Sequence, residues 1–109
     1  MKDNIPQDLL IVVGARHYSA NIKFLISTDD KNSLKCDGTA TIFHEKDNQF
    51  DKNAIAVEVD NRIVGYISKF RSAQLLKLIG DRKVELNCTL LWNGDPEEDY
   101  CMYTVQLFV

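Results

Sequence analysis

A five-residue segment near the middle of the chain carries a dense set of groups that could bind a ligand. Residues 49–53 read QFDKN and place an aromatic ring, a carboxylate, an ammonium and an amide close together. Such groups can act by stacking, charge and hydrogen bonding. Asp51 and Asn53 are also common turn residues, because their side chains hydrogen-bond nearby backbone groups. The segment therefore has two interpretations, a recognition loop and a structural turn.

Two further sets of binding groups lie on either side of this segment. Arg16, His17 and Tyr18 follow an apolar run, and a guanidinium can pair with phosphate while an aromatic ring can stack on a base. Lys69 and Arg71 fall in the first turn of a predicted helix, where side-chain charge and free backbone N–H groups both attract phosphate. These residue types point to nucleic acid, although a lone histidine is more often an ordinary strand-end residue.

The elements that must position these groups are mostly short strands. Two apolar-alternating runs, residues 54–59 and 63–67, flank Asp60-Asn61-Arg62 and predict a β-hairpin with a tight turn. Polar loops are predicted at residues 28–38 and 95–99 from their Asp, Asn, Gly and Glu content. Further strands are predicted at residues 9–18, 21–27, 39–45, 83–92 and 100–109.

One helix is predicted between these strands, at residues 69–79. Phe70 and Ala73 fall on its apolar face with Leu75, Leu76 and Ile79. Ser68 is a typical N-cap and Gly80 stands where a C-terminal cap is preferred.

The size and composition indicate one compact domain. The chain has 109 residues, of which 45% are hydrophobic, enough for a single core but too few for two ordinary domains. We expect a lead-in at residues 1–8 and one domain at residues 9–109. The apolar run at residues 9–13 is too short to span a bilayer, and the N-terminus lacks the apolar centre of a signal peptide, so a cytoplasmic location is expected. Three cysteines without a CxxC pair favour reduced thiols over disulfides or a zinc site, and neither a metal nor a cofactor is expected.

The charge of the chain is unevenly distributed. The net charge is −3, which is not typical of a nucleic-acid binder. Residues 61–83 nevertheless hold 6 Lys or Arg against 1 Asp, whereas residues 84–109 hold 5 acidic residues and no Lys or Arg. A local basic patch of this kind can hold a few phosphates, and it can equally be an ordinary solvated face.

The combined spacing of several short motifs resembles the HIRAN domain family. The resemblance runs from about Val12 to Ile79 and rests on three stretches and a short helix that holds Ala73. The stretches are Gly14-x-Arg16-x-Tyr18, Asp51-x-Asn53-Ala54-Ile55-x-Val57 and Val64-Gly65-Tyr66-Ile67-x-Lys69. The family occurs in DNA translocases that remodel stalled replication forks and as stand-alone proteins in bacteria and phages. It implies a mainly β fold, a small OB-like barrel of six or seven strands with one short helix, which agrees with the predicted elements.

The resemblance also implies a function and a site. HIRAN domains bind single-stranded DNA ends with a free 3′-hydroxyl in DNA repair and replication, so we expect a non-enzymatic module that acts with a helicase or nuclease on a separate chain. Carried over by position, Phe50 would stack on the terminal nucleotide and Asp51 would accept a hydrogen bond from the 3′-hydroxyl. The other residues expected to hold the strand are Arg16, His17, Tyr18, Tyr66, Lys69 and Arg71. A C-terminal aromatic residue, Tyr103 or Phe108, would close the pocket.

Two other classes of function stay open. A protein-interaction module that has lost the DNA pocket is favoured by the net negative charge and by His17, which stands where DNA-binding relatives often have a second aromatic residue. An enzyme is disfavoured because the sequence has no Walker motif, no metal-ligand set and no nucleophile spaced with a base.

Overall fold

The structure is a computed structural model that describes residues 4–27, 35–92 and 103–109. At its centre is one antiparallel sheet with the strand order β1-β4-β3-β2-β5-β6. The strands are β1 (Val12–Val13), β2 (Lys35–His44), β3 (Ile55–Val59), β4 (Arg62–Ile67), β5 (Val84–Trp92) and β6 (Tyr103–Phe108). The helices are α1 (Ser19–Ser27), α2 (Lys69–Ile79) and two short 3-10 helices, η1 (Gln7–Leu9) and η2 (Ala15–Tyr18).

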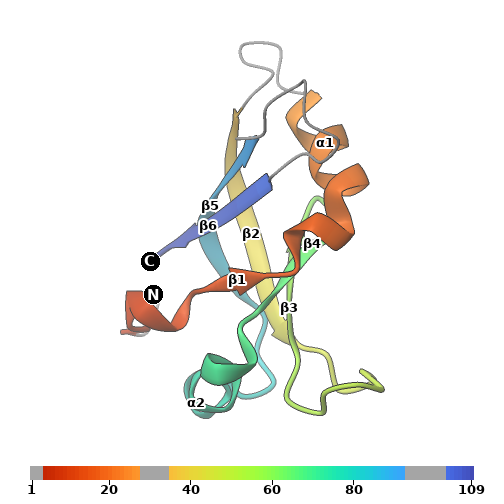
Figure 1. Cartoon of the computed structure of the whole chain (residues 1–109). Helices are drawn as coiled ribbons and strands as arrows, with labels where there is room; N and C mark the ends of the chain where they lie inside the picture. Colours follow the sequence, from red (N-terminus) through yellow and green to blue (C-terminus); the bar gives the residue numbers. More distant parts are fainter. Residues whose placement is uncertain (1–3, 28–34, 93–102) are drawn as a thin grey trace.

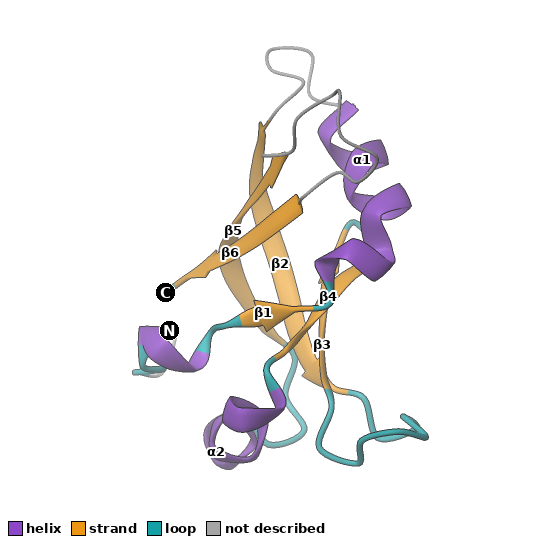
Figure 2. Ribbon diagram, viewed as in Figure 1, coloured by secondary structure: helices purple, strands orange, loops and turns teal. Residues whose placement is uncertain are grey.

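The sheet curls until its two edge strands meet. β1 and β6 are in contact (Figure 1), and the side chain of Gln7 joins the N-terminal segment to β6. Gln7 Nε2 donates a hydrogen bond to the carbonyl oxygen of Leu107, and the N–H of Val109 donates to Gln7 Oε1 at 3.2 Å. The predicted mainly β fold is confirmed as a nearly closed, barrel-like sheet, compatible with a small OB-like barrel. α1 and α2 lie at opposite ends of this barrel (Figure 2).

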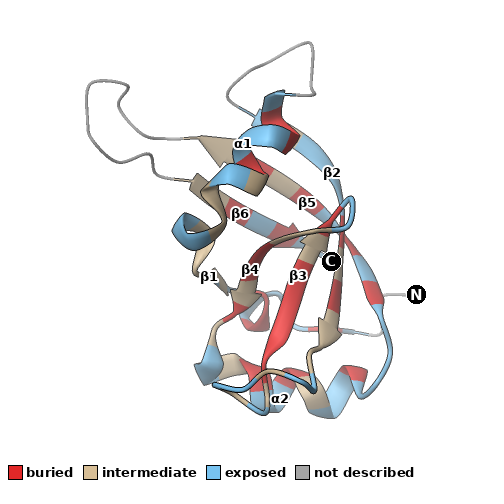
Figure 3. Ribbon diagram, turned by 90° about the vertical axis from the view of Figure 1, so that its right-hand side faces the viewer, coloured by how far each residue is buried: buried red, intermediate tan, exposed pale blue. Residues whose placement is uncertain are grey.

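The core fills the inside of the barrel with aliphatic side chains. Buried and exposed positions alternate in β5 from Val84 to Cys88, as expected for a strand with one face towards solvent. In contrast, β3 is buried along nearly its whole length (Figure 3). The most completely buried large side chains are Leu9, Ile22, Ile42, Ile55, Leu75, Ile79, Leu86, Leu90 and Leu107.

The central hairpin is confirmed. Asp60 and Asn61 both have positive φ, 49° and 65°, which is the geometry of the two-residue turn that matches the twist of the paired strands. Downstream, Gly65 allows β1 to lie close beside β4. A Cβ atom at position 65 would lie 2.7 Å from Val12 Cγ1 and 2.9 Å from the carbonyl oxygen of Val13. The hairpin and β1 are therefore packed without room for a side chain at position 65.

Helix α2 has the predicted bounds and caps. Ser68 Oγ accepts a hydrogen bond from the N–H of Phe70 at 3.4 Å, and Gly80 has a φ of 58° with its N–H bonded to Leu76 at 2.8 Å. The predicted apolar face is only partly right. Phe70 and Ala73 are exposed, because the buried side of the helix is formed by Ser72, Leu75 and Ile79.

The strand predicted at residues 21–27 is wrong, because this segment lies in helix α1. Ile22, Leu25 and Ile26 are spaced three and four residues apart and bury one helical face. Asn21 Nδ2 also donates to the carbonyl oxygen of Ile63 at 2.9 Å, which ties α1 to the hairpin. The burial of side chains at helical spacing stabilises a helix here, and it has a larger effect than the weak hydrophobic alternation of seven residues that favours a strand.

The strand predicted at residues 9–18 is also too long. Only Val12–Val13 pair with β4, because Gly14 turns the chain with a φ of 78° into the 3-10 helix η2. The predicted lead-in is packed where it is described, since Ile5 is buried.

Two predicted loops lie wholly or partly outside the described residues. β2 begins at Lys35, so the last four residues of the loop predicted at 28–38 are strand, while residues 28–34 and the loop at 95–99 lie outside the described residues. In the described part of the chain, no helix is both long enough and apolar enough to cross a membrane.

Candidate nucleic-acid interface

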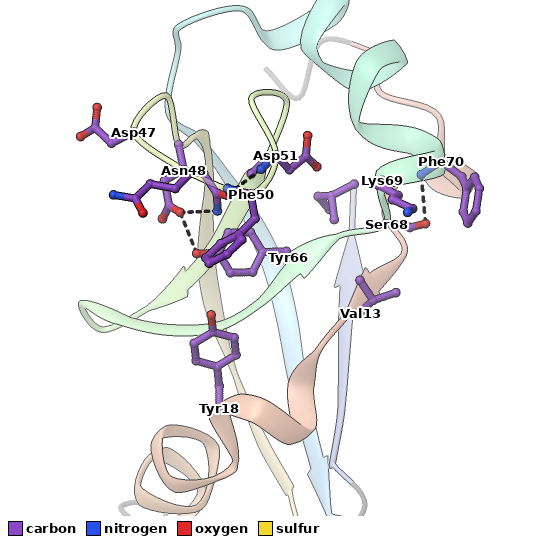
Figure 4. A pocket seen from close by; sticks show the side chains of 14 residues that line it. Val13, Tyr18, Asp47, Asn48, Phe50, Asp51, Tyr66, Ser68, Lys69 and Phe70 are labelled. Atoms are coloured by element: carbon purple, nitrogen blue, oxygen red, sulfur yellow. Dashed lines mark hydrogen bonds between the residues drawn. The ribbon is translucent and has the colours of Figure 1, made fainter.

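A pocket of about 770 Å³ lies where three parts of the fold meet. These are the loop of residues 45–51 that follows β2, the end of β4, and the first turn of α2 (Figure 4), and β1 and η2 each add one lining residue, Val13 and Tyr18. The volume falls within the roughly 300–1,000 Å³ that is usual for small-ligand pockets. The lining residues are Val13, Tyr18, Glu45, Asp47, Asn48, Gln49, Phe50, Asp51, Ala54, Tyr66, Ile67, Ser68, Lys69 and Phe70.

The side chain of Asn48 holds the pocket loop in shape. Its Oδ1 accepts hydrogen bonds from the backbone N–H groups of Phe50 and Asp51, both at 2.9 Å, and its Nδ2 donates to Glu45 Oε1 at 2.9 Å. One amide thus bonds to three points of a seven-residue loop. This arrangement fixes the backbone from which the Phe50 ring and the Asp51 carboxylate project.

Glu45 joins this loop to the barrel wall. The hydroxyl of Tyr66 donates to Glu45 Oε1 at 2.8 Å, so one carboxylate oxygen accepts from both β4 and the loop. Partial burial, and then the hydrogen bond to Glu45, raises the pKa of Tyr66 above the ordinary range of tyrosine. The ring of Tyr18 lies against that of Tyr66, with centroids 6.0 Å apart and planes tilted by 48°. Tyr18 and Tyr66 together form one wall of the pocket.

Asp51 is both a turn residue and a lining residue of the pocket, so both interpretations of residues 49–53 apply to it. Its Oδ1 accepts the N–H of Asn53 at 2.9 Å, and its carbonyl accepts the N–H of Ala54 at 3.1 Å, which is turn chemistry. Its other carboxylate oxygen has no hydrogen-bond partner among the described residues, and the side chain lines the pocket. The turn therefore presents a carboxylate oxygen that is available to a ligand.

The structure brings together five of the eight residues predicted for the site. These five line the pocket and are Tyr18, Phe50, Asp51, Tyr66 and Lys69. Arg16 and His17 are exposed on η2 and do not line it. Arg71 directly follows the lining residues Lys69 and Phe70 on α2, but it does not line the pocket. Of the two C-terminal aromatics predicted to close the pocket, neither Tyr103 nor Phe108 lines it.

Nine of the lining residues were not predicted as site residues, and three of these, Glu45, Asn48 and Phe70, matter most to the geometry of the pocket. The sequence pattern places Glu45 at the end of a strand and Asn48 in a loop, although a carboxylate and an amide three positions apart can indicate a side-chain contact. The hydrophobic pattern predicts Phe70 on the core face of α2. No sequence signal distinguishes an aromatic residue in the first turn of a helix that faces the core from one that faces a pocket.

The charges around the pocket are divided between its two sides. Glu45, Asp47 and Asp51 lie on the loop side, and Lys69 lies on the helix side. Lys46, although in the same loop, does not line the pocket and forms an ion pair with Asp81 at 2.8 Å. This contact holds the pKa of Asp81 below its usual range.

The basic segment at residues 61–83 does not form a single patch. Arg62 lies 3.9 Å from the ring centroid of Phe24 on α1, while Arg82 donates to the carbonyls of Leu78 and Ile79 at the end of α2. Lysine and arginine side chains of this segment are therefore spread over both ends of the barrel. No group of three His, Cys, Asp or Glu residues within the described ranges could hold a metal ion.

A curled antiparallel barrel with an aromatic and polar pocket beside its central hairpin defines a small β-barrel binding domain. The chain belongs to the HIRAN domain family, whose model matches residues 10–108. This membership implies a DNA-binding module. The comparisons with curated proteins and with solved structures found no match.

Proposed function

We propose that this protein is a non-enzymatic module that binds the end of a DNA single strand through a free 3′-hydroxyl. The observation that carries the proposal is the pair of adjacent side chains that the pocket loop presents, the almost fully exposed ring of Phe50 and the carboxylate of Asp51. A ring offers a stacking surface for the terminal nucleotide, and a carboxylate only accepts hydrogen bonds.

The division of charge in the pocket supports an end rather than the middle of a strand. A phosphodiester beside Asp51 would place negative charge against that carboxylate, in a pocket that Glu45 and Asp47 also line, whereas a terminal hydroxyl can donate a hydrogen bond to Asp51. Lys69 supplies the positive charge that the nearest phosphate needs. Affinity in the micromolar range is expected at low salt, since each stacked base contributes about 1–3 kcal/mol.

The same charges favour a second candidate, a protein-interaction module. Three carboxylates and one ammonium line the pocket, and such a site suits a basic segment of a partner protein. In either case we propose that catalysis resides on another chain, a helicase or nuclease that works in DNA repair, replication or the processing of mobile elements.

Fluorescence anisotropy with four labelled oligonucleotides tests the DNA proposal. The probes are a single strand with a 3′-hydroxyl, the same strand with a 3′-phosphate, a blunt duplex and single-stranded RNA. Selective binding to the free 3′-hydroxyl strand is expected. Absence of binding to all four at low salt would refute DNA binding and favour the protein partner.

Two substitutions make the test specific to Asp51. Asp51→Asn keeps an oxygen that can accept the N–H of Asn53 but removes the negative charge, so discrimination against the 3′-phosphate should fall. Asp60→Asn is the matched control, because Asp60 lies in the exposed hairpin turn and does not line the pocket. Equal effects of the two substitutions would contradict the role of Asp51.

A further inference from the structure

The first turn of α2 exposes a second aromatic ring at the pocket. Phe70 is 83% exposed, and it lines the same pocket as Phe50, which is 97% exposed. Single exposed apolar residues are common on protein surfaces. Two nearly bare rings that line one pocket are less usual, because each exposes a large apolar area that a bound base could cover.

Lys69 separates the two rings. In Figure 4 the Phe50 ring, Lys69 and the Phe70 ring follow one another from the loop side of the pocket to the helix side. Lys69 Nζ lies 5.8 Å from the centroid of the Phe70 ring. A cation between two stacking surfaces matches the chemistry of a dinucleotide, in which one phosphate joins two bases.

The carboxylates dictate the direction in which a strand can leave. Glu45, Asp47 and Asp51 lie on the loop side, where each further phosphate would be repelled. The helix side holds Lys69, and Arg71 follows it by two residues on α2. A strand whose terminal nucleotide stacks on Phe50 therefore runs over Lys69 towards Phe70.

We propose that Phe70 is the stacking surface for the nucleotide next to the terminal one, so that the pocket recognises the last two nucleotides of a strand. This inference rests on the proposed binding of a DNA end. The sequence pattern predicted Phe70 in the core, whereas this inference gives Phe70 a part in specificity. The alternative exit, past Tyr18 towards Arg16, is distinguished by the test below.

The experiment uses oligonucleotides with the fluorescent base 2-aminopurine at the terminal or at the next position, because stacking on an aromatic ring quenches its emission. The wild-type protein should quench both positions. Phe70→Ala should abolish quenching at the second position, keep it at the terminal position and weaken binding about 5- to 150-fold, the range that corresponds to the loss of one stacked base.

Matched variants control for the fold. Phe70→Tyr keeps a ring and should restore quenching at the second position. Leu78→Ala removes an exposed apolar side chain from the last turn of the same helix and should leave both signals unchanged. Phe50→Ala should abolish quenching at the terminal position.

Each other outcome refutes a stated part of the scheme. Quenching at the second position that survives Phe70→Ala, or is lost in Arg16→Ala instead, overturns the inference and leaves end binding intact. If the wild-type protein quenches only the terminal position, the inference is likewise overturned and end binding is left intact. If the wild-type protein binds no strand at all, the inference and the proposed function fail together.

Discussion

The hydroxyl of Tyr66 donates a hydrogen bond to Glu45 at 2.8 Å, and this contact joins the barrel wall to the loop that forms one side of the pocket. The two residues are 21 positions apart in the chain. Because Asn48 donates to the same carboxylate oxygen and accepts from the backbone N–H groups of Phe50 and Asp51, the wall and the loop form one connected set of hydrogen bonds.

Removal of this hydroxyl should loosen the loop more than the barrel. Tyr66→Phe keeps the ring but deprives Glu45 of one donor, so the free energy of unfolding should fall by about 1–2 kcal/mol. Urea denaturation measures this change. Amide hydrogen exchange should accelerate at Phe50 and Asp51 and stay unchanged in β5, and acceleration in β5 as well would indicate a general loss of packing.

The same hydroxyl makes stability depend on pH at the alkaline end. The pKa of Tyr66 is raised in the folded state, whereas the phenol of the unfolded chain ionises near pH 10. Above that pH the folded state binds more protons than the unfolded state, so stability falls as pH rises. The difference in unfolding free energy between the wild type and Tyr66→Phe should therefore shrink above pH 10. Urea titrations from pH 8 to 11.5 check this, and a constant difference would contradict it.

Gly65 should tolerate no side chain. A methyl group there would meet Val12 Cγ1 at 2.7 Å and the carbonyl oxygen of Val13 at 2.9 Å, and overpacking of this kind costs about 1–3 kcal/mol. Gly38→Ala is the matched control, because nothing lies within 4 Å of a Cβ atom at position 38. Chemical denaturation should separate the two variants clearly, and equal stability would mean that β1 moves away from β4 without cost.

The salt dependence of DNA binding should identify Lys69 as the phosphate contact of the pocket. Lys69→Met should reduce the slope of log affinity against log salt by about 0.7, the value for one phosphate of a single strand. Lys77→Met, in the last turn of the same helix, should leave the slope unchanged. Binding measured at several salt concentrations decides the matter, and equal slopes for all three proteins would exclude the contact.

The thiol of Cys88 should react only when the barrel opens. Burial, and then the nearby Cys36 and Asp37, raises the pKa of Cys88 to about 12, so little thiolate is present at pH 8. In a variant with Cys36→Ser and Cys101→Ser, labelling by a disulfide reagent should be slow and should accelerate in urea as the protein unfolds. Fast labelling in the absence of urea would show that β5 is accessible in the native state.

Sequence patterns predicted the elements whose local chemistry is decisive. The hairpin follows from Asp60-Asn61, which adopts positive φ easily, and α2 follows from the caps at Ser68 and Gly80. Helix α1 was missed because its identity depends on burial against the barrel, which involves residues far away in the chain.

The site was predicted in part for a similar reason. Phe50 and Asp51 were found because they are adjacent in one loop, Lys69 because it falls in the first turn of a predicted helix, and Tyr66 because the family resemblance indicated it. Glu45 and Phe70 line the pocket because of how the loop and α2 are placed relative to each other. No local sequence pattern indicates that placement. Arg16 and His17 were expected at the pocket from a continuous strand, but the turn at Gly14 carries them onto η2.

The clasp formed by Gln7 has a mechanical consequence. The seam between β1 and β6 is held near the chain ends by two side-chain hydrogen bonds, whereas each of the longer strands is held by a full ladder to its neighbours. A pull on both ends of the chain would load this clasp first. On the N-terminal side the next strand to carry the load is β1, which contributes Val13 to the pocket, and on the C-terminal side it is β6, which is paired with β5, so tension at the N-terminal end would be transmitted to the binding site through β1.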